Sequence, residues 1–201
     1  GTDALVCALA ASGIKAGDEV ITPPNSFIAS TSAISHLNAL PVFVDVLDDQ
    51  SIDPNLVSKA ITSKTKAIMP VHLTGRMSDM AQLKSIAEKF DIKLIEDAAQ
   101  SIGSTYQNIQ AGRFGDVGCF STHPLKNLNA CGDGGFIISD NGEIANKIRK
   151  MRNHGMVDRE TVESFGYVSR MDTIQAAILS YRINNLDEVI KKRRSNAKIY
   201  I

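Results

Sequence analysis

The sequence lacks the features that mark several large classes of protein. Its 201 residues include 22 Lys+Arg and 22 Asp+Glu, a balance that gives no reason to expect nucleic acid or an anionic membrane as a partner. No apolar run approaches the length of a membrane span, and no signal peptide is visible at the start. The length is that of one sizeable α/β domain with its own hydrophobic core.

Cysteine is also scarce. Cys7, Cys119 and Cys131 are an odd number with no paired spacing, which favours reduced thiols and a cytoplasmic setting over a disulfide framework. No CxxC or HxxxH pattern occurs among these cysteines and the four histidines, so no metal site is expected.

What the chain does contain is an alternation of short apolar runs with segments of helical periodicity, without internal repeats or a linker. Strands are expected at residues 18–22, 42–46 (a buried strand), 65–73, 91–97, 117–121 and 135–139. Helices are expected at residues 28–39, 53–61, 80–90 and 144–151, and in a long segment from a capping box at Asp172 and Gln175 past Leu186. This alternation predicts an α/β three-layer sandwich with a mostly parallel central sheet, in one domain spanning residues 1–201.

A lysine in an unusual setting is the first candidate for chemistry. In "CFSTHPLKNLNACGDGGF", an apolar run ends at Ser121, and Lys126 follows in a stretch with proline and asparagine before a glycine-rich turn. A desolvated lysine amine can act as a nucleophile and form a Schiff base with a carbonyl. The alternative is a solvated loop lysine.

A carboxylate follows another strand, in "LIEDAAQS". Asp97 at a buried strand end is costly unless it is paired, and a protonated pyridine nitrogen is one suitable partner. The alternatives are a helix N-cap and a surface ion pair. Glu96 precedes it and is expected to point to the opposite face of the strand.

Two further segments offer a phosphate site and an aromatic ring. Gly1, Thr2 and Asp3 open an apolar helical stretch whose free N–H groups favour a phosphate, to which Ser121 could also donate; an ordinary capped helix is the alternative. Phe27 in "PPNSFIAS" could stack on a planar ring or could belong to the core.

These elements share one end of the predicted sheet. Asp97, Ser121 and Lys126 all follow carboxyl ends of strands, where parallel sheets bind ligands. A phosphate cradle, a stacking aromatic, a carboxylate for a ring nitrogen and a lysine for an aldehyde are the four needs of pyridoxal 5'-phosphate (PLP).

The segments "GTDAL", "EDAAQS", "FSTHPLKNLNACGDGG", "RNHG" and "SRMDTIQAAIL" resemble, in order and spacing, the PLP-dependent nucleotide-sugar aminotransferases, the DegT/StrS-like enzymes of fold type I. The resemblance extends over nearly the whole chain. It implies the large, PLP-binding domain of that family, with the family's N-terminal segment and small C-terminal domain absent.

The resemblance also assigns roles to residues. It implies that Lys126 bonds to the PLP aldehyde and shuttles protons, that Asp97 pairs with the pyridine nitrogen, and that Gln100 lies near the ring oxygen. It implies that Phe27 stacks on the ring, and that the phosphate is held by Thr2, the Asp3 backbone and Ser121.

The family's reaction and assembly come with the resemblance. Glutamate is the usual amino donor, a keto-sugar on a nucleotide diphosphate is the acceptor, polysaccharide biosynthesis is the setting, and the enzymes are homodimers. One position departs from the pattern, since Val168 stands where many relatives have an asparagine that reaches the partner's cofactor phosphate.

Three alternatives stay open at this point. One is a PLP-dependent sugar dehydratase of the same family, against which Lys126 argues because that branch has histidine in its place. Another is a non-catalytic fragment that binds PLP and dimerises. The third is a phosphate-binding α/β protein without PLP.

Overall fold

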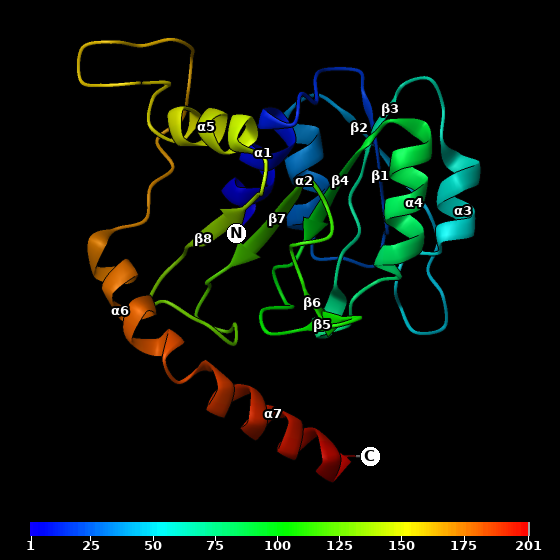
Figure 1. Ribbon diagram of the computed structural model, residues 1–201, viewed down its shortest axis with the longest axis vertical. Coiled ribbons are helices and arrows are strands. Elements are labelled where there is room, and N and C mark those ends of the chain that lie inside the picture. The colour runs from blue at the N-terminus through cyan, green and yellow to red at the C-terminus, as the bar shows by residue number, and fades with distance from the viewer. Residues whose placement is uncertain (201) are drawn as a thin grey trace.

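The computed structural model describes residues 1–200 and is built around one six-stranded sheet (Figure 1). The sheet has the strand order β2-β1-β3-β4-β7-β8, and all neighbouring strands are parallel except β7 and β8. Its strands are β1 (Glu19–Thr22), β2 (Leu40–Phe43), β3 (Thr65–Ile68), β4 (Lys93–Asp97), β7 (Val117–Ser121) and β8 (Gly135–Ile138). A separate hairpin is formed by β5 (Thr105–Tyr106) and β6 (Ile109–Gln110).

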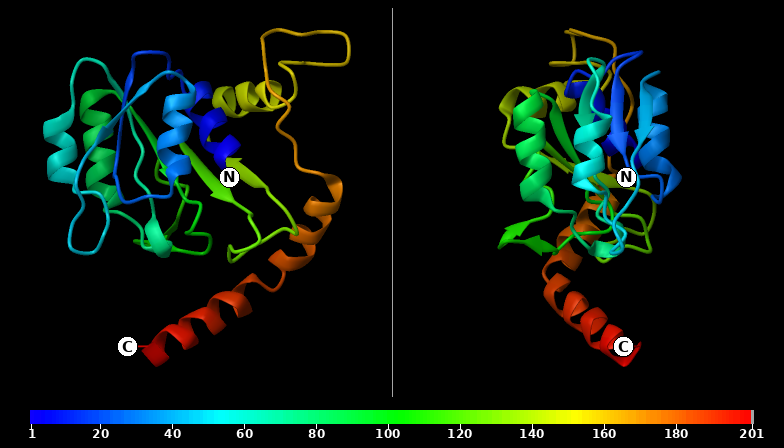
Figure 2. Two further views of the ribbon diagram at one scale, coloured as in Figure 1. Left: turned by 180° about the vertical axis from the view of Figure 1, so that it is seen from behind. Right: turned by 90° about the vertical axis from the view of Figure 1, so that its right-hand side faces the viewer.

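Helices cover both faces of this sheet, as the edge-on view in Figure 2 shows. The helices that the structure describes are α1 (Thr2–Ala11), α2 (Ile28–His36), α3 (Pro54–Ala60), α4 (Met80–Phe90), α5 (Gly142–Met151), α6 (Thr173–Ile183) and α7 (Leu186–Tyr200), with a short 3-10 turn η1 (Leu73–Gly75). One face carries α1, α2 and α5, and the other carries α3 and α4. The predicted three-layer α/β sandwich is therefore confirmed.

Two hydrophobic clusters hold the layers together. Within β1, Val20 packs into the cluster with α1, α2 and α5, whereas Ile21 packs into the cluster with α3 and α4. Ile95 and Leu94 of β4 divide in the same way. This alternation is the consequence of the two-residue period of a strand that is buried on both faces.

The second predicted strand is displaced in the structure. It begins at Leu40 and ends at Phe43, not at residues 42–46, and it lies at the edge of the sheet. Leu40 and Phe43 are 51% and 52% exposed, so the expectation of a buried strand is wrong. An apolar run does not reveal whether its strand has one neighbour or two.

The predicted long C-terminal helix is two helices. It breaks between α6 and α7 at residues 184–185, and both helices extend away from the sheet in Figure 1. Asp172 is the N-cap residue of α6 but makes no side-chain capping bond, and Gln175 instead bonds Cys131, so the expected capping box is wrong. Within residues 1–200, no helix has the length and apolar character needed to cross a membrane.

Candidate functional site

Asp97 ends β4 on the face of the sheet that α2 covers. It is 4% exposed, and its Oδ2 accepts a hydrogen bond from Ser30 Oγ at 2.6 Å while Oδ1 accepts from the Ala99 N–H at 3.1 Å. Burial raises the pKa of Asp97, and its hydrogen bonds from Ser30 and Ala99 and the charge of Lys126 oppose this shift only in part. Asp97 is buried, and β4 is followed by β5 with no helix between them among the described residues, so neither a surface ion pair nor a helix N-cap describes this residue.

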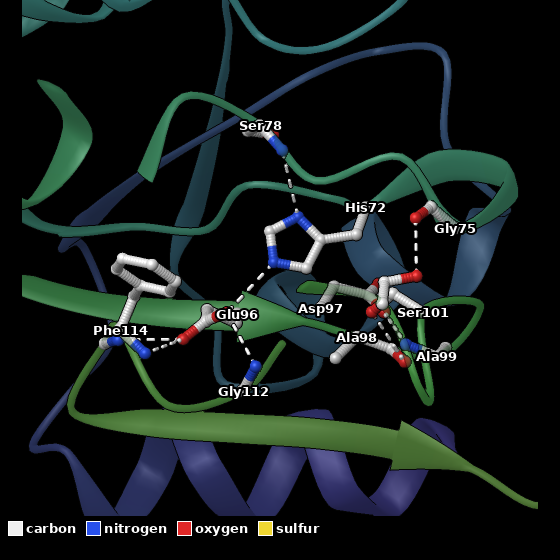
Figure 3. Close-up of polar contacts among 12 residues, drawn as sticks. His72, Gly75, Ser78, Glu96, Asp97, Ala98, Ala99, Ser101, Gly112 and Phe114 are labelled. Atoms are coloured by element: carbon white, nitrogen blue, oxygen red, sulfur yellow. Dashed lines mark hydrogen bonds and ion pairs between the residues drawn. The ribbon is translucent and has the colours of Figure 1, made fainter. Parts of the chain in front are cut away.

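Glu96 points to the other face, as predicted from the strand period (Figure 3). Its Oε1 accepts from the N–H groups of Phe114 and Gly115 at 2.7 and 2.8 Å. Its Oε2 accepts from the Gly112 N–H at 2.7 Å and lies 3.0 Å from His72 Nε2. Burial alone would raise the pKa of Glu96, but these hydrogen bonds outweigh it and lower that pKa.

His72 contacts both the Glu96 carboxylate and the backbone at the carboxyl end of β4. The Ser78 N–H donates to His72 Nδ1 at 3.4 Å, which leaves Nε2 as the donor to Glu96. The His72 backbone N–H donates to the Asp97 carbonyl at 3.0 Å. Glu96 and His72 therefore fix the strand end that carries Asp97, on the side away from α2.

Lys126 is half-buried in the loop between β7 and β8. The loop follows β7, whose Cys119 pairs with Asp97 of β4 and whose last residue, Ser121, lies against Gly1. Lysine, buried carboxylate and the start of α1 therefore converge, although they lie in separate parts of the sequence. A lysine beside a buried carboxylate can capture a carbonyl compound whose cationic part sits on that carboxylate.

The start of α1 lies against the last residue of β7 and the first residue of β8. A Cβ built on Gly1 would come within 2.8 Å of Ser121 Cβ and 3.0 Å of Ser121 Oγ. A Cβ on Gly135 would come within 3.0 Å of the Gly1 Cα and 2.6 Å of the Phe120 carbonyl. The glycines of "GDGG" thus allow a close backbone approach, and the helix N-terminus and the Ser121 hydroxyl lie next to each other as an anion site requires.

A groove of about 810 Å³ opens at this point, lined by α1, β8, α5 and residues 168–171. Thr2 and Asp3 both line it and are exposed. The Asp3 carboxylate accepts a hydrogen bond from Ser169 Oγ at 2.7 Å, so only its backbone is free to serve an anion. Val168 also lines the groove and is 60% exposed.

Phe27 and Gln100 come from two segments next to Asp97: Phe27 precedes the helix that carries Ser30, and Gln100 follows β4. Phe27 is the N-cap residue of α2, one turn before Ser30, and is 71% exposed, so the alternative of core packing is wrong. Its ring is free to cover a ligand. Gln100 Oε1 accepts from the Thr74 N–H at 2.8 Å and holds Thr74 at a φ of 56°.

The sequence did not reveal Ser30, His72, Gln175 or Arg182 as contributors to this region. Ser30 lies 67 residues from its partner Asp97, and Arg182 lies 53 residues from its partner Asn129. Neither residue belongs to a recognisable short motif. Only the three-dimensional contacts identify them.

The residues present fit one class of ligand. A buried carboxylate suits a protonated ring nitrogen, a neighbouring lysine suits an aldehyde, and a helix N-terminus with a serine hydroxyl suits a phosphate. The fold and this arrangement define an α/β protein of the PLP-dependent transferase class. The chain belongs to the DegT/DnrJ/EryC1/StrS aminotransferase family, whose model matches residues 1–201. The family resemblance predicted from the sequence is thereby confirmed.

Individual relatives agree over the whole chain. A pleiotropic regulatory protein of Geobacillus stearothermophilus is 45% identical over 201 residues, which are 100% of this chain and 54% of that protein. A UDP-N-acetyl-3-dehydro-alpha-D-glucosamine 3-aminotransferase of Acidithiobacillus ferrooxidans is 44% identical over 202 residues, with 100% and 54% covered. The crystal structure of NtdA from Bacillus subtilis with bound cofactor PMP superposes with a TM-score of 0.87 at 41% identity, covering 92% of this chain and 42% of that one. The chain spans about half the length of the curated relatives it matches.

Proposed function

We propose that this chain forms the PLP-binding part of an aminotransferase that transfers an amino group from glutamate to a keto-sugar carried on a nucleotide diphosphate. The observation that carries the proposal is the placement of buried Asp97 on the strand beside β7, with Ser121 at the end of β7 against the start of α1 and Lys126 in the loop that follows. The family and the named activity of the Acidithiobacillus relative support the reaction and the class of acceptor.

Each side chain has a distinct task in this proposal. Bound PLP supplies an aldehyde for amine exchange and an electron-withdrawing ring. Lys126 would supply the amine for that aldehyde and, as a free amine, would move a proton at its Nζ. Asp97, already buried and bonded by Ser30, keeps a proton on the ring nitrogen. Phe27 covers one face of the ring and excludes water from it.

The phosphate end relies on backbone groups more than on charge. The N–H groups at Thr2 and Asp3 and the hydroxyls of Thr2 and Ser121 act as donors, helped by the dipole of α1. Gln100, three residues beyond the end of β4, would serve the ring oxygen. A valine at position 168 cannot donate to a phosphate, so the cradle does not depend on that side chain.

The assembly and setting are part of the proposal. A homodimer is supported by exposed apolar side chains at Val162, Phe165 and Val168, of which Val168 lines the groove at α1. A cytoplasmic location is supported by three free cysteines, Cys7, Cys119 and Cys131. The sugar product would feed polysaccharide biosynthesis.

The test is a single-turnover assay of the purified protein loaded with PLP. Glutamate should be converted to 2-oxoglutarate in an amount equal to the bound cofactor, and a nucleotide-linked keto-sugar added next should receive the nitrogen from labelled glutamate. Bound PLP with no 2-oxoglutarate formed would contradict transamination from glutamate and would favour the non-catalytic alternative. Absence of any bound PLP would contradict the cofactor assignment itself.

A further inference from the structure

The loop that carries Lys126 is closed on itself. We define the lysine loop as residues 122–131. At its base, the Ala130 N–H donates to the Thr122 carbonyl at 2.8 Å. Nearer to the lysine, Asn129 Nδ2 donates to the Pro124 carbonyl at 2.6 Å. This bond links a residue two positions before Lys126 to a residue three positions after it. The path of the backbone through Lys126 is therefore determined by the position of Asn129.

Two polar side chains of helix α6 form hydrogen bonds with the lysine loop. Arg182 Nη1 donates to the Asn129 carbonyl at 2.7 Å and also to Asn129 Oδ1. Gln175 Oε1 accepts from the Cys131 N–H at 2.8 Å. Gln175 and Arg182 are seven residues apart, so they project from the same face of the helix, two turns from each other.

This contact is polar and specific. None of the residues of α6 is buried, and Ile174 and Tyr181 are 71% and 73% exposed, so the helix contributes no side chain to the core. What α6 gives the lysine loop is a guanidinium and an amide oxygen. Because the Arg182 guanidinium binds both oxygens of Asn129, it leaves the Asn129 amide nitrogen directed at Pro124.

We propose that Arg182 and Gln175 are positioning residues that act through Asn129 and Cys131 to place the Lys126 amine for capture of an aldehyde. The inference rests on the proposed function. In the captured step, Lys126 Nζ forms a bond to the aldehyde carbon, and the aldehyde oxygen leaves as water. Loss of the contacts from Arg182 and Gln175 to the lysine loop should leave the phosphate cradle and Asp97 unchanged. It should widen the range of positions that the Lys126 amine samples.

The test separates binding from capture with two forms of the cofactor. Pyridoxamine 5'-phosphate has no aldehyde, so its dissociation constant reports the pocket without the lysine. Incubation with PLP followed by borohydride reduction reports the rate at which the lysine amine captures the aldehyde. Arg182→Met should slow capture about ten- to a hundredfold, the factor expected for loss of one charged hydrogen bond, and should change pyridoxamine phosphate binding less than about twofold.

Two further variants make the assignment specific. Asn129→Ala should also slow capture, and its effect should add less than fully to that of Arg182→Met, because both variants remove the bond between the guanidinium and Asn129 Oδ1. Arg182→Lys, which keeps one donor, should recover part of the rate. The control is Arg193→Met on α7, an exposed arginine outside this contact, which should leave capture unchanged.

Hydrogen exchange gives a readout that needs no cofactor. In Arg182→Met, the amides of Lys126 and Ala130 should exchange faster, and in Gln175→Ala the amide of Cys131 should do so. Capture at the wild-type rate, or unchanged exchange in the lysine loop, would overturn the inference while leaving the proposed function intact. Failure of the wild-type protein to capture PLP would overturn the proposed function and the inference with it.

Discussion

Replacement of Glu96 by glutamine is the sharpest probe of how the strand end is held. The carboxylate of Glu96 is fully buried and acts only as an acceptor, with three backbone N–H groups and His72 Nε2 directed at its two oxygens. Glutamine has the same shape but presents an amide NH₂ in place of one oxygen. If its oxygen keeps Phe114 and Gly115, its NH₂ faces the Gly112 N–H and the His72 Nε2–H, and these donors meet without an acceptor.

The magnitude follows from that count of bonds. A buried N–H left without an acceptor costs about 1–3 kcal/mol, and the bonds that remain lose the strength that the charged acceptor gave them. We therefore expect Glu96→Gln to lower the free energy of unfolding by about 3 kcal/mol at pH 7. Glu88→Gln, at an exposed position on α4, is the matched control and should change it by less than about 0.5 kcal/mol.

The effect of Glu96→Gln should also depend on pH. The hydrogen bonds lower the pKa of Glu96 below its ordinary value of 4.5, so its contribution to stability is present above that value and is lost as the pH falls through the lowered pKa. Urea unfolding of both proteins between pH 3 and pH 8 measures the difference. It should be largest at neutral pH and shrink in acid. A loss below about 1 kcal/mol at pH 7, or a loss independent of pH, would refute this account of Glu96.

Two other predictions concern buried positions near the site. Asp97→Asn should stabilise the cofactor-free protein by about 1–3 kcal/mol at pH 7. Burial raises the pKa of Asp97, so the stability that the protonated side chain contributes is lost as the pH rises above the ordinary value of 3.8. Equal or lower stability of the variant in thermal unfolding at pH 7 would contradict this. Gly118→Ala should destabilise by about 2 kcal/mol or more, since its Cβ would lie 2.4 Å from the Gly112 Cα, whereas Gly142→Ala, with nothing within 4 Å, should be neutral or stabilising by up to about 1 kcal/mol. Equal urea midpoints for these two glycine variants would show that the backbone around Gly118 yields without strain.

The sequence predicted those parts of the site that depend on strand ends. Asp97, Ser121 and Lys126 could be grouped because each follows an apolar run, and the carboxyl ends of parallel strands meet at one edge of a sheet. The opposite orientation of Glu96 followed from the two-residue period of a strand. These are local patterns, and the structure agrees with them.

The parts that could not be predicted depend on contacts between distant segments. Ser30 is one serine in an ordinary helical stretch until α2 brings it to Asp97. The capping box expected at Asp172 was wrong because Gln175 is taken by Cys131, a tertiary contact that outweighs the local one. The break between α6 and α7 could not be predicted either, because no proline or glycine marks it in the sequence.

The position of covalent PLP attachment tests the central claim most directly. The protein is incubated with PLP, reduced with borohydride and digested, and the modified peptide is identified by mass spectrometry in wild type, Lys126→Ala and Lys59→Ala. The account predicts modification at Lys126 in wild type and in Lys59→Ala, and loss of covalent PLP attachment in Lys126→Ala. Equal attachment in wild type and Lys126→Ala would contradict it.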